Sequence, residues 1–232
     1  MLSRAADANA ESIKTTTPSE EGSRGRATLR NYARNINPKD KYALKYFKHV
    51  AVSTMERKSK GKEYDSILVL CIGCEHILAG ADNLGPLIGC ALKQKPHIEN
   101  VYVYGTMESP LHAQNLKNEI DKIYARHEKP FVIGIDLSTS KNKRKLGLTQ
   151  FRAGQIKPGE GVDTELPALG DVYATAYLVH CDKNDTADDL FNKILMTDRA
   201  IVKQTAEFMA AGIYEALREV VNKGVILAGS KK

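Results

Sequence analysis

The hydrophobic residues of this chain gather in short continuous runs, separated by longer stretches of mixed apolar and polar character. Four of these runs predict strands, at residues 66–73, 101–105, 131–136 and 172–179. Because the apolar residues in each run are consecutive rather than alternating, each strand is expected to be covered on both faces. Strands of this kind are typical of a parallel sheet.

The segments between these runs show helical spacing. The first helix is expected to follow Asp40, as its N-cap, and to end near Met55. The other expected helices and their stop signal are residues 86–92, 110–126 and 186–222, with Gly224 after the last. The alternation of strands and helices predicts an α/β fold, a three-layer α/β/α domain around a doubly wound, mostly parallel sheet.

The first 38 residues have a different composition. They are rich in Ser, Thr, Ala, Glu and Arg and contain few large apolar side chains, so burial cannot repay the entropy of ordering them. We expect a disordered tail over residues 1–38 and a single domain over 39–232. The chain shows neither a secretory signal nor an apolar run of membrane-spanning length, which predicts a cytoplasmic protein without a membrane partner.

The net charge of +6 is unevenly distributed. Residues 1–62 hold 14 Lys and Arg against 6 Asp and Glu, whereas the remaining residues hold 20 against 22. The basic character therefore belongs to the tail and the first helix, and no specific nucleic-acid partner is expected. The four cysteines are unevenly spread, three of them within apolar runs, which disfavours a disulfide framework.

Two carboxylates follow predicted strands, where doubly wound sheets bind their ligands. Asp82 lies in the loop after the first strand, and Asp136 is expected at the tip of the third. Asp82 alone is also a good helix N-cap, and Asp136 alone suits a turn with Ser138 to Ser140. If the two converge, they can activate water as an acid and base pair, or hold a divalent metal ion. The spacing leaves these alternatives open.

Other motifs favour structural roles. The triplet Cys74-Glu75-His76 lacks the second half of a zinc motif, and no glycine-rich phosphate loop is present. His112 is expected on the first turn of a helix, where a surface role is usual. The glycine-rich segment 154–162 predicts a turn or hairpin, and the basic run 141–145 predicts a solvated loop bordering the crevice, able to attract an acidic partner.

Several segments together resemble the YyaC family of sporulation proteins. In chain order they are ADNLGPLIG, VYGTMESPLHAQNL, VIGID and LPALGDVYATAYLV, and the resemblance covers about residues 66–180. That family is similar to the germination protease, which degrades small acid-soluble spore proteins. It is more distantly similar to the hydrogenase maturation proteases.

The resemblance implies a peptidase-like hydrolase in a spore or forespore. The protease's D-x-L-G-P aspartate corresponds to Asp82 and its second functional aspartate to Asp136, with Glu75, Gly85 and His112 as additional site residues. The implied partner is a peptide or protein, such as a small acid-soluble spore protein, or a second copy in a homo-oligomer. The maturation proteases make the two aspartates candidate ligands for a divalent metal, the one cofactor considered, although their histidine ligand has no match. The alternatives are a non-catalytic sporulation or binding protein retaining the fold, and a metal-binding factor similar to the maturation proteases.

Overall fold

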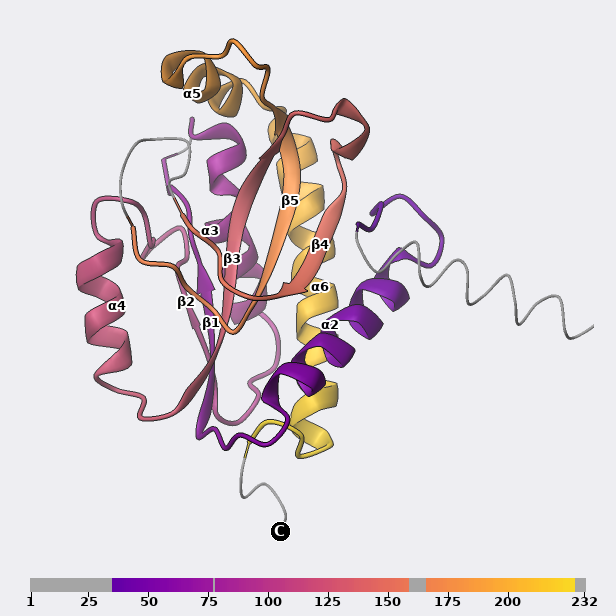
Figure 1. Cartoon of the computed structure of the whole chain (residues 1–232), viewed down its shortest axis with the longest axis vertical. Coiled ribbons are helices and arrows are strands. Elements are labelled where there is room, and N and C mark those ends of the chain that lie inside the picture. Colours follow the sequence, from indigo (N-terminus) through magenta and orange to yellow (C-terminus); the bar gives the residue numbers. More distant parts are fainter. Residues whose placement is uncertain (1–34, 77, 159–165, 228–232) are drawn as a thin grey trace, which may run out of the picture.

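The computed structural model describes residues 35–76, 78–158 and 166–227 of the 232-residue chain. A single five-stranded sheet has the order β2-β1-β3-β5-β4 (Figure 1). Its first four strands in that order run parallel, and β4 is antiparallel to β5. The strands are β1 (Ser66–Cys71), β2 (Val101–Tyr104), β3 (Pro130–Ser140), β4 (Thr149–Ala153) and β5 (Val172–His180). The predicted mostly parallel sheet is thus confirmed.

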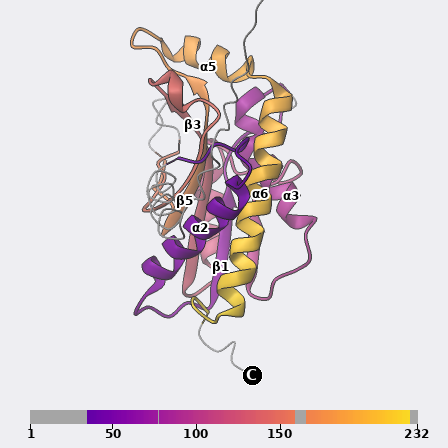
Figure 2. The same cartoon turned by 90° about the vertical axis from the view of Figure 1, so that its right-hand side faces the viewer.

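Helices cover both faces of this sheet. Figures 1 and 2 show α2 (Ala43–Ser59), α3 (Leu84–Lys93) and α6 (Arg199–Asn222) on one side, packed against one apolar cluster. On the opposite face α4 (Leu116–Tyr124) packs against a second cluster, which includes Leu68, Leu70 and Val132. All six side chains of the central strand β1 are therefore buried, as its continuous apolar run predicted. The α/β three-layer architecture follows.

The structure corrects several predicted helix bounds. The first helix begins at Ala43 with Tyr42 as its N-cap, so Asp40 does not cap it. The predicted helix over 186–222 is two helices, α5 (Ala187–Leu195) and α6, because the side chain of Asp198 caps the second by accepting a hydrogen bond from Ala200 N–H. Gly224 follows α6 with a φ of 61°, which confirms the predicted stop.

The residues before α4 form turns instead of its first helical turns. Asn115 closes them, since its Oδ1 accepts a hydrogen bond from His112 N–H at 2.9 Å and its Nδ2 donates one to the Pro110 carbonyl at 2.9 Å. The helix predicted from residue 110 therefore starts only at Leu116. His112 consequently lies in a loop and not on a helical turn.

The antiparallel strand β4 was not predicted. Its sequence, TQFRA, carries one large apolar residue, Phe151, and its Gln150 is buried through a hydrogen bond from Nε2 to Thr175 Oγ1 at 2.8 Å. Ile36 is 1% exposed and pairs with Thr149 in an antiparallel bridge. Ile36 therefore belongs to the folded part of the chain and not to a tail over residues 1–38, and residues 1–34 lie outside the described part. None of the described helices combines the length and apolarity needed to cross a membrane.

Candidate active site

The chain reverses its winding direction between β1 and β3. The connection from β1 to β2 passes through α3 on one face, and the connection from β2 to β3 passes through α4 on the other. Strands β2 and β3 lie on either side of β1 in the sheet. The chain therefore leaves the carboxyl ends of the neighbouring strands β1 and β3 in opposite directions. Ligands of doubly wound folds bind at such a switch point. Both candidate aspartates belong to these two strands or the loops after them.

Asp136 lies within β3 rather than at its tip. Strand β1 ends at Cys71, paired with Ile135, whereas β3 continues to Ser140 because it still pairs with β5. Asp136 is therefore the first β3 residue beyond the end of β1, which leaves its side chain half-buried at the switch point. Its Oδ1 accepts a hydrogen bond from Leu137 N–H at 2.7 Å, in place of the expected turn with Ser138 to Ser140.

Asp82 lies in the short 3₁₀ helix η1 (Gly80–Asn83) and is also half-buried. It is not the N-cap of α3, because that position is Asn83. The loop folds back on itself at Gly73: a Cβ there would lie 2.2 Å from the Asp82 carbonyl oxygen, and Cys74 N–H donates to that oxygen at 3.0 Å. Only a glycine at residue 73 permits this close approach.

Asn83 is a site residue that sequence reasoning missed. It is 5% exposed, and its Nδ2 donates hydrogen bonds to the carbonyls of Cys74 at 2.7 Å and His76 at 3.0 Å. One side chain thereby ties two main-chain carbonyls of this loop to the residue next to Asp82. The sequence signal that could have identified it is an asparagine directly after the candidate aspartate, because asparagine side chains readily form hydrogen bonds with the main chain.

The two aspartates interact electrostatically. Burial raises the pKa of Asp136 well above its ordinary value of 3.8, and the negative charge of Asp82 raises it further. Burial also raises the pKa of Asp82, but the main-chain N–H of Cys74 and the nearby His112 act in the opposite direction. The environments therefore separate the two carboxyls: Asp136 retains its proton more strongly than Asp82.

The loop after β2 brings His112 to the pair. Leu111 forms a bridge with Ile72, and its carbonyl accepts a hydrogen bond from Gly73 N–H at 2.9 Å. The next residue, His112, is thereby placed close enough to Asp82 to favour its ionised form. The loops after β1 and β2 and the strand β3 thus contribute to one site.

The remaining predicted site residues have different positions. Gly85 lies where α3 crosses the end of β1, and a Cβ there would be 2.0 Å from the Ile72 carbonyl oxygen, so its role is close packing. Glu75 is exposed on the loop. Burial raises the pKa of Cys74, and the charges of Asp82 and Glu75 raise it further. His76 N–H donates to Cys74 Sγ at 3.4 Å, so the Cys-Glu-His triplet forms a local turn.

For a metal ion, Asp82 and Asp136 would provide only two carboxylate ligands. Catalytic zinc sites usually have three protein ligands. Within the described ranges, no three His, Cys, Asp or Glu side chains are grouped in a metal-binding arrangement. Of the predicted glycine-rich turn, Ile156 pairs with Leu169 in an antiparallel bridge, and residues 159–165 lie outside the described part. The basic run is an exposed turn containing η2 (Lys143–Lys145).

The sequence is similar to one protein family and to one of the curated proteins. The family described as "Protein of unknown function (DUF1256)" matches residues 35–204. The "Uncharacterized protein YyaC" of Bacillus subtilis (strain 168) is 38% identical over 138 residues, which cover 60% of this chain and 63% of that protein. The chain thus spans less than two thirds of this relative's length, and the resemblance to YyaC is confirmed.

A solved structure, the [NiFe] hydrogenase maturation protease HycI from Thermococcus kodakarensis KOD1, aligns with 71% of this chain and 98% of its own. The two are 21% identical with a TM-score of 0.43.

Proposed function

The chain belongs to the DUF1256 family, and we propose that it is a peptidase-like hydrolase in which Asp82 and Asp136 act together on a water molecule. The observation that carries the proposal is the electrostatic coupling of two half-buried carboxylates from separate segments at the switch point of the sheet. Buried acidic side chains are costly to maintain unless they are paired or useful. Coupled carboxyls with separated pKa values are the arrangement that general acid and base catalysis requires.

Their environments assign the two roles. Asp82, the carboxyl that ionises more readily, accepts a proton from water while the water oxygen attacks the scissile carbonyl carbon. Asp136, whose pKa is raised further, donates its proton to the carbonyl oxygen as the tetrahedral intermediate forms. Collapse of the intermediate returns that proton to Asp136, and Asp82 passes its own proton to the leaving amine. The pair then holds its original single proton.

Neighbouring residues support these roles. His112 and the main-chain N–H of Cys74 both favour the ionised form of Asp82, which keeps it available as a base. Asn83 ties the Asp82 loop to the carbonyls of Cys74 and His76, and Gly85 lets α3 pack closely at the end of β1. Glu75, exposed at the rim of the same loop, is positioned to contact an approaching substrate rather than the water molecule.

The substrate class rests on resemblance. The motifs shared with YyaC and the germination protease support a peptide or protein substrate, with small acid-soluble spore proteins the first to be tested, and a cytoplasmic or forespore setting. No step of this mechanism is routed through a metal ion. The alternative is a non-catalytic binding protein of sporulation that retains the fold.

The test compares four proteins: the parent chain, Asp82→Asn, Asp136→Asn and Asp121→Asn, a matched change at an exposed carboxylate on α4. Each is incubated with small acid-soluble spore proteins and with a general peptide library, and products are identified by mass spectrometry. Cleavage by the parent and Asp121→Asn is expected, and each site variant should lower the rate by about 10²- to 10⁴-fold. Absence of cleavage by folded parent protein would favour the binding-protein alternative.

A further inference from the structure

The outer edge of β2 has no neighbouring strand within the described part of the chain, because β2 is the terminal strand of the sheet. Ile67 N–H donates to the Asn100 carbonyl at 2.8 Å, and hydrogen bonds along a parallel pair alternate from residue to residue. The main-chain groups of Tyr102 and Tyr104 therefore face β1. The N–H and C=O of Val103 face outward, available to pair with another extended chain.

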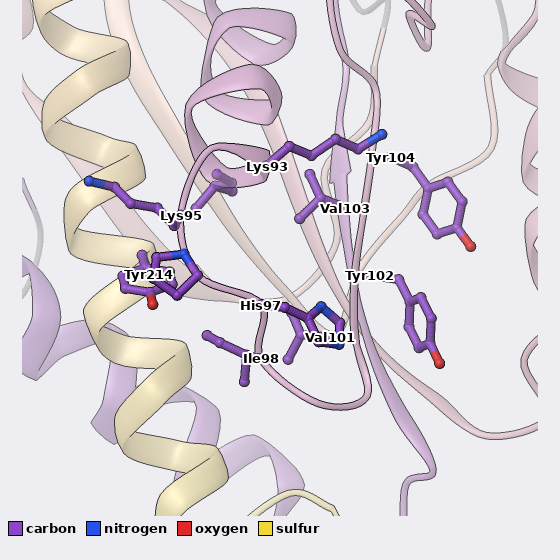
Figure 3. Close-up of a pocket in the computed structure, with 11 residues that line it drawn as sticks. Lys93, Lys95, His97, Ile98, Val101, Tyr102, Val103, Tyr104 and Tyr214 are labelled. Carbon is purple, nitrogen blue, oxygen red and sulfur yellow. The ribbon is translucent and has the colours of Figure 1, made fainter.

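Two hollows flank this edge. The first, about 320 Å³, is lined by Val101 and Val103 of the strand and by Ile98 and Tyr214 across from them (Figure 3). The second, about 250 Å³, includes Tyr104, Gly105 and Leu111. Neither contains Asp82 or Asp136. Because Leu111 directly precedes His112, however, the second hollow extends to the loop that borders the aspartate pair.

The rim of these hollows is basic. Four Lys and Arg side chains line them, against a single carboxylate, Glu119, which already binds Lys122 at 2.7 Å. The four are Lys93, Lys95, Lys122 and Arg126. Residues 63–232 together contain slightly more acidic than basic side chains, so this concentration of positive charge is a local feature. It complements an acidic partner.

Aromatic side chains add contact surface. Tyr102 is 41% exposed, and its ring lies against that of His127, with centroids 4.6 Å apart and the ring planes tilted by 58°. Tyr104 OH lies 2.9 Å from His127 Nε2, which fixes the second tyrosine beside the first. Figure 3 shows both tyrosines projecting to the same side of β2. Partly exposed, positioned tyrosines are typical of binding surfaces.

We propose that the outer edge of β2 binds an extended acidic segment of a partner protein as an added strand. The outward main-chain groups of Val103 provide the pairing, the flanking hollows receive alternate side chains, and the basic rim selects Asp and Glu. A second copy of this chain is a poor occupant, because two such edges would bring their lysines together. If the proposed function holds, this acidic segment is part of the substrate; the binding itself does not depend on catalysis.

The experiment uses the full chain carrying Asp136→Asn, so that binding is read without cleavage. A fluorescent extended peptide in which Glu alternates with Val is titrated by anisotropy, beside a peptide in which Lys replaces Glu. The edge variants are Lys93→Glu combined with Lys95→Glu, and Val103→Pro, which removes the outward N–H but no hydrogen bond to β1. The matched control is Lys39→Glu, near Ile36 at the opposite, β4 edge of the sheet.

We expect the acidic peptide to bind, more weakly as salt is added, and the basic peptide not to bind. Each edge variant should weaken binding by about tenfold or more, and Lys39→Glu should leave it unchanged. Hydrogen–deuterium exchange provides a readout that needs no edge variant: bound peptide should slow exchange of the Val103 amide. This measurement decides the matter if Val103→Pro does not fold.

Failure of the acidic peptide to bind, equal binding by the edge variants, or unchanged exchange at Val103 would overturn the proposal. A concentration-dependent dimer in sedimentation velocity that Val103→Pro abolishes would overturn it as well, in favour of a second copy. None of these four results bears on cleavage, which is tested separately with the aspartate variants. Failure of the edge and failure of the catalytic pair are thus distinguishable.

Discussion

Substituting Gly85 with alanine tests whether the position of the Asp82 loop depends on the close crossing of α3 over β1. The added Cβ would lie 2.0 Å from the carbonyl oxygen of Ile72, and its next two neighbours are main-chain atoms of the same residue. Ordinary contact begins at 3.4 Å, so the helix must move away from the strand by more than an ångström. Ile72 directly follows β1, and its N–H donates to the Ile135 carbonyl at 2.8 Å, so its main chain cannot yield as a side chain does.

The expected cost follows from overpacking a close-packed region, about 1–3 kcal/mol. For a protein of this size, that lowers the melting temperature by about 2–12 °C. Because Asp82 precedes the crossing by only three residues, the same shift should separate the aspartate pair. Under the proposed function, a displacement of about 1 Å lowers the cleavage rate by about 100-fold.

The assay is thermal unfolding followed by circular dichroism, beside the matched variant Gly212→Ala. The Cβ of that variant would meet the Phe47 ring at 2.4 Å, a contact with a side chain rather than with main chain, so a smaller loss of stability is expected. Equal melting temperatures for Gly85→Ala and the parent would refute the reasoning. A loss no larger than that of Gly212→Ala would show that the contact with Ile72 is not the rigid one.

Three further predictions concern pH and stability. Because the pKa of Asp136 is raised in the folded state, ionisation of this carboxyl opposes folding. The free energy of unfolding of the parent should therefore fall as pH rises above 3.8 through the folded pKa. Urea unfolding across pH should show that Asp136→Asn lacks this loss. Thr186→Ala removes the capping box with Asp189 and should cost about 0.5–2 kcal/mol, seen in the same unfolding curves. Phe47→Ala, at a fully buried ring, should cost about 3–5 kcal/mol; a cost below that of Thr186→Ala would contradict the assigned core.

The strands that the sequence predicts best are those buried on both faces. A continuous apolar run indicates a strand covered on both faces, so the ends of β1, β2, β3 and β5 were predicted to within a few residues. Strand β4 escaped notice because its burial depends on a polar pair, Gln150 and Thr175, whose hydrogen bond exists only after folding. Local pattern carries no information about a partner 25 residues away.

The candidate aspartates were identified from their place after strands, but their environments were not. Neither acts as the local cap or turn that its neighbours allow, because the register of β1 against β3 determines what surrounds Asp136. Asn83 was missed for the same reason, since its two carbonyl partners lie seven and nine residues earlier in a folded loop. Tertiary contacts thus decide between the structural and the chemical roles of these residues.

The first and last helices of the described chain pack against each other on one face of the sheet. Phe47 of α2 lies between Phe151 of β4 and Phe208 of α6, with ring centroids 6.1 and 5.5 Å away. During synthesis, α2 leaves the ribosome some 150 residues before α6. The apolar side chains of α2 therefore remain exposed to solvent until α6 is made. Completion of the core therefore requires the synthesis of α6, and a chain released before residue 199 would leave this apolar face exposed, as a substrate for chaperones and proteases.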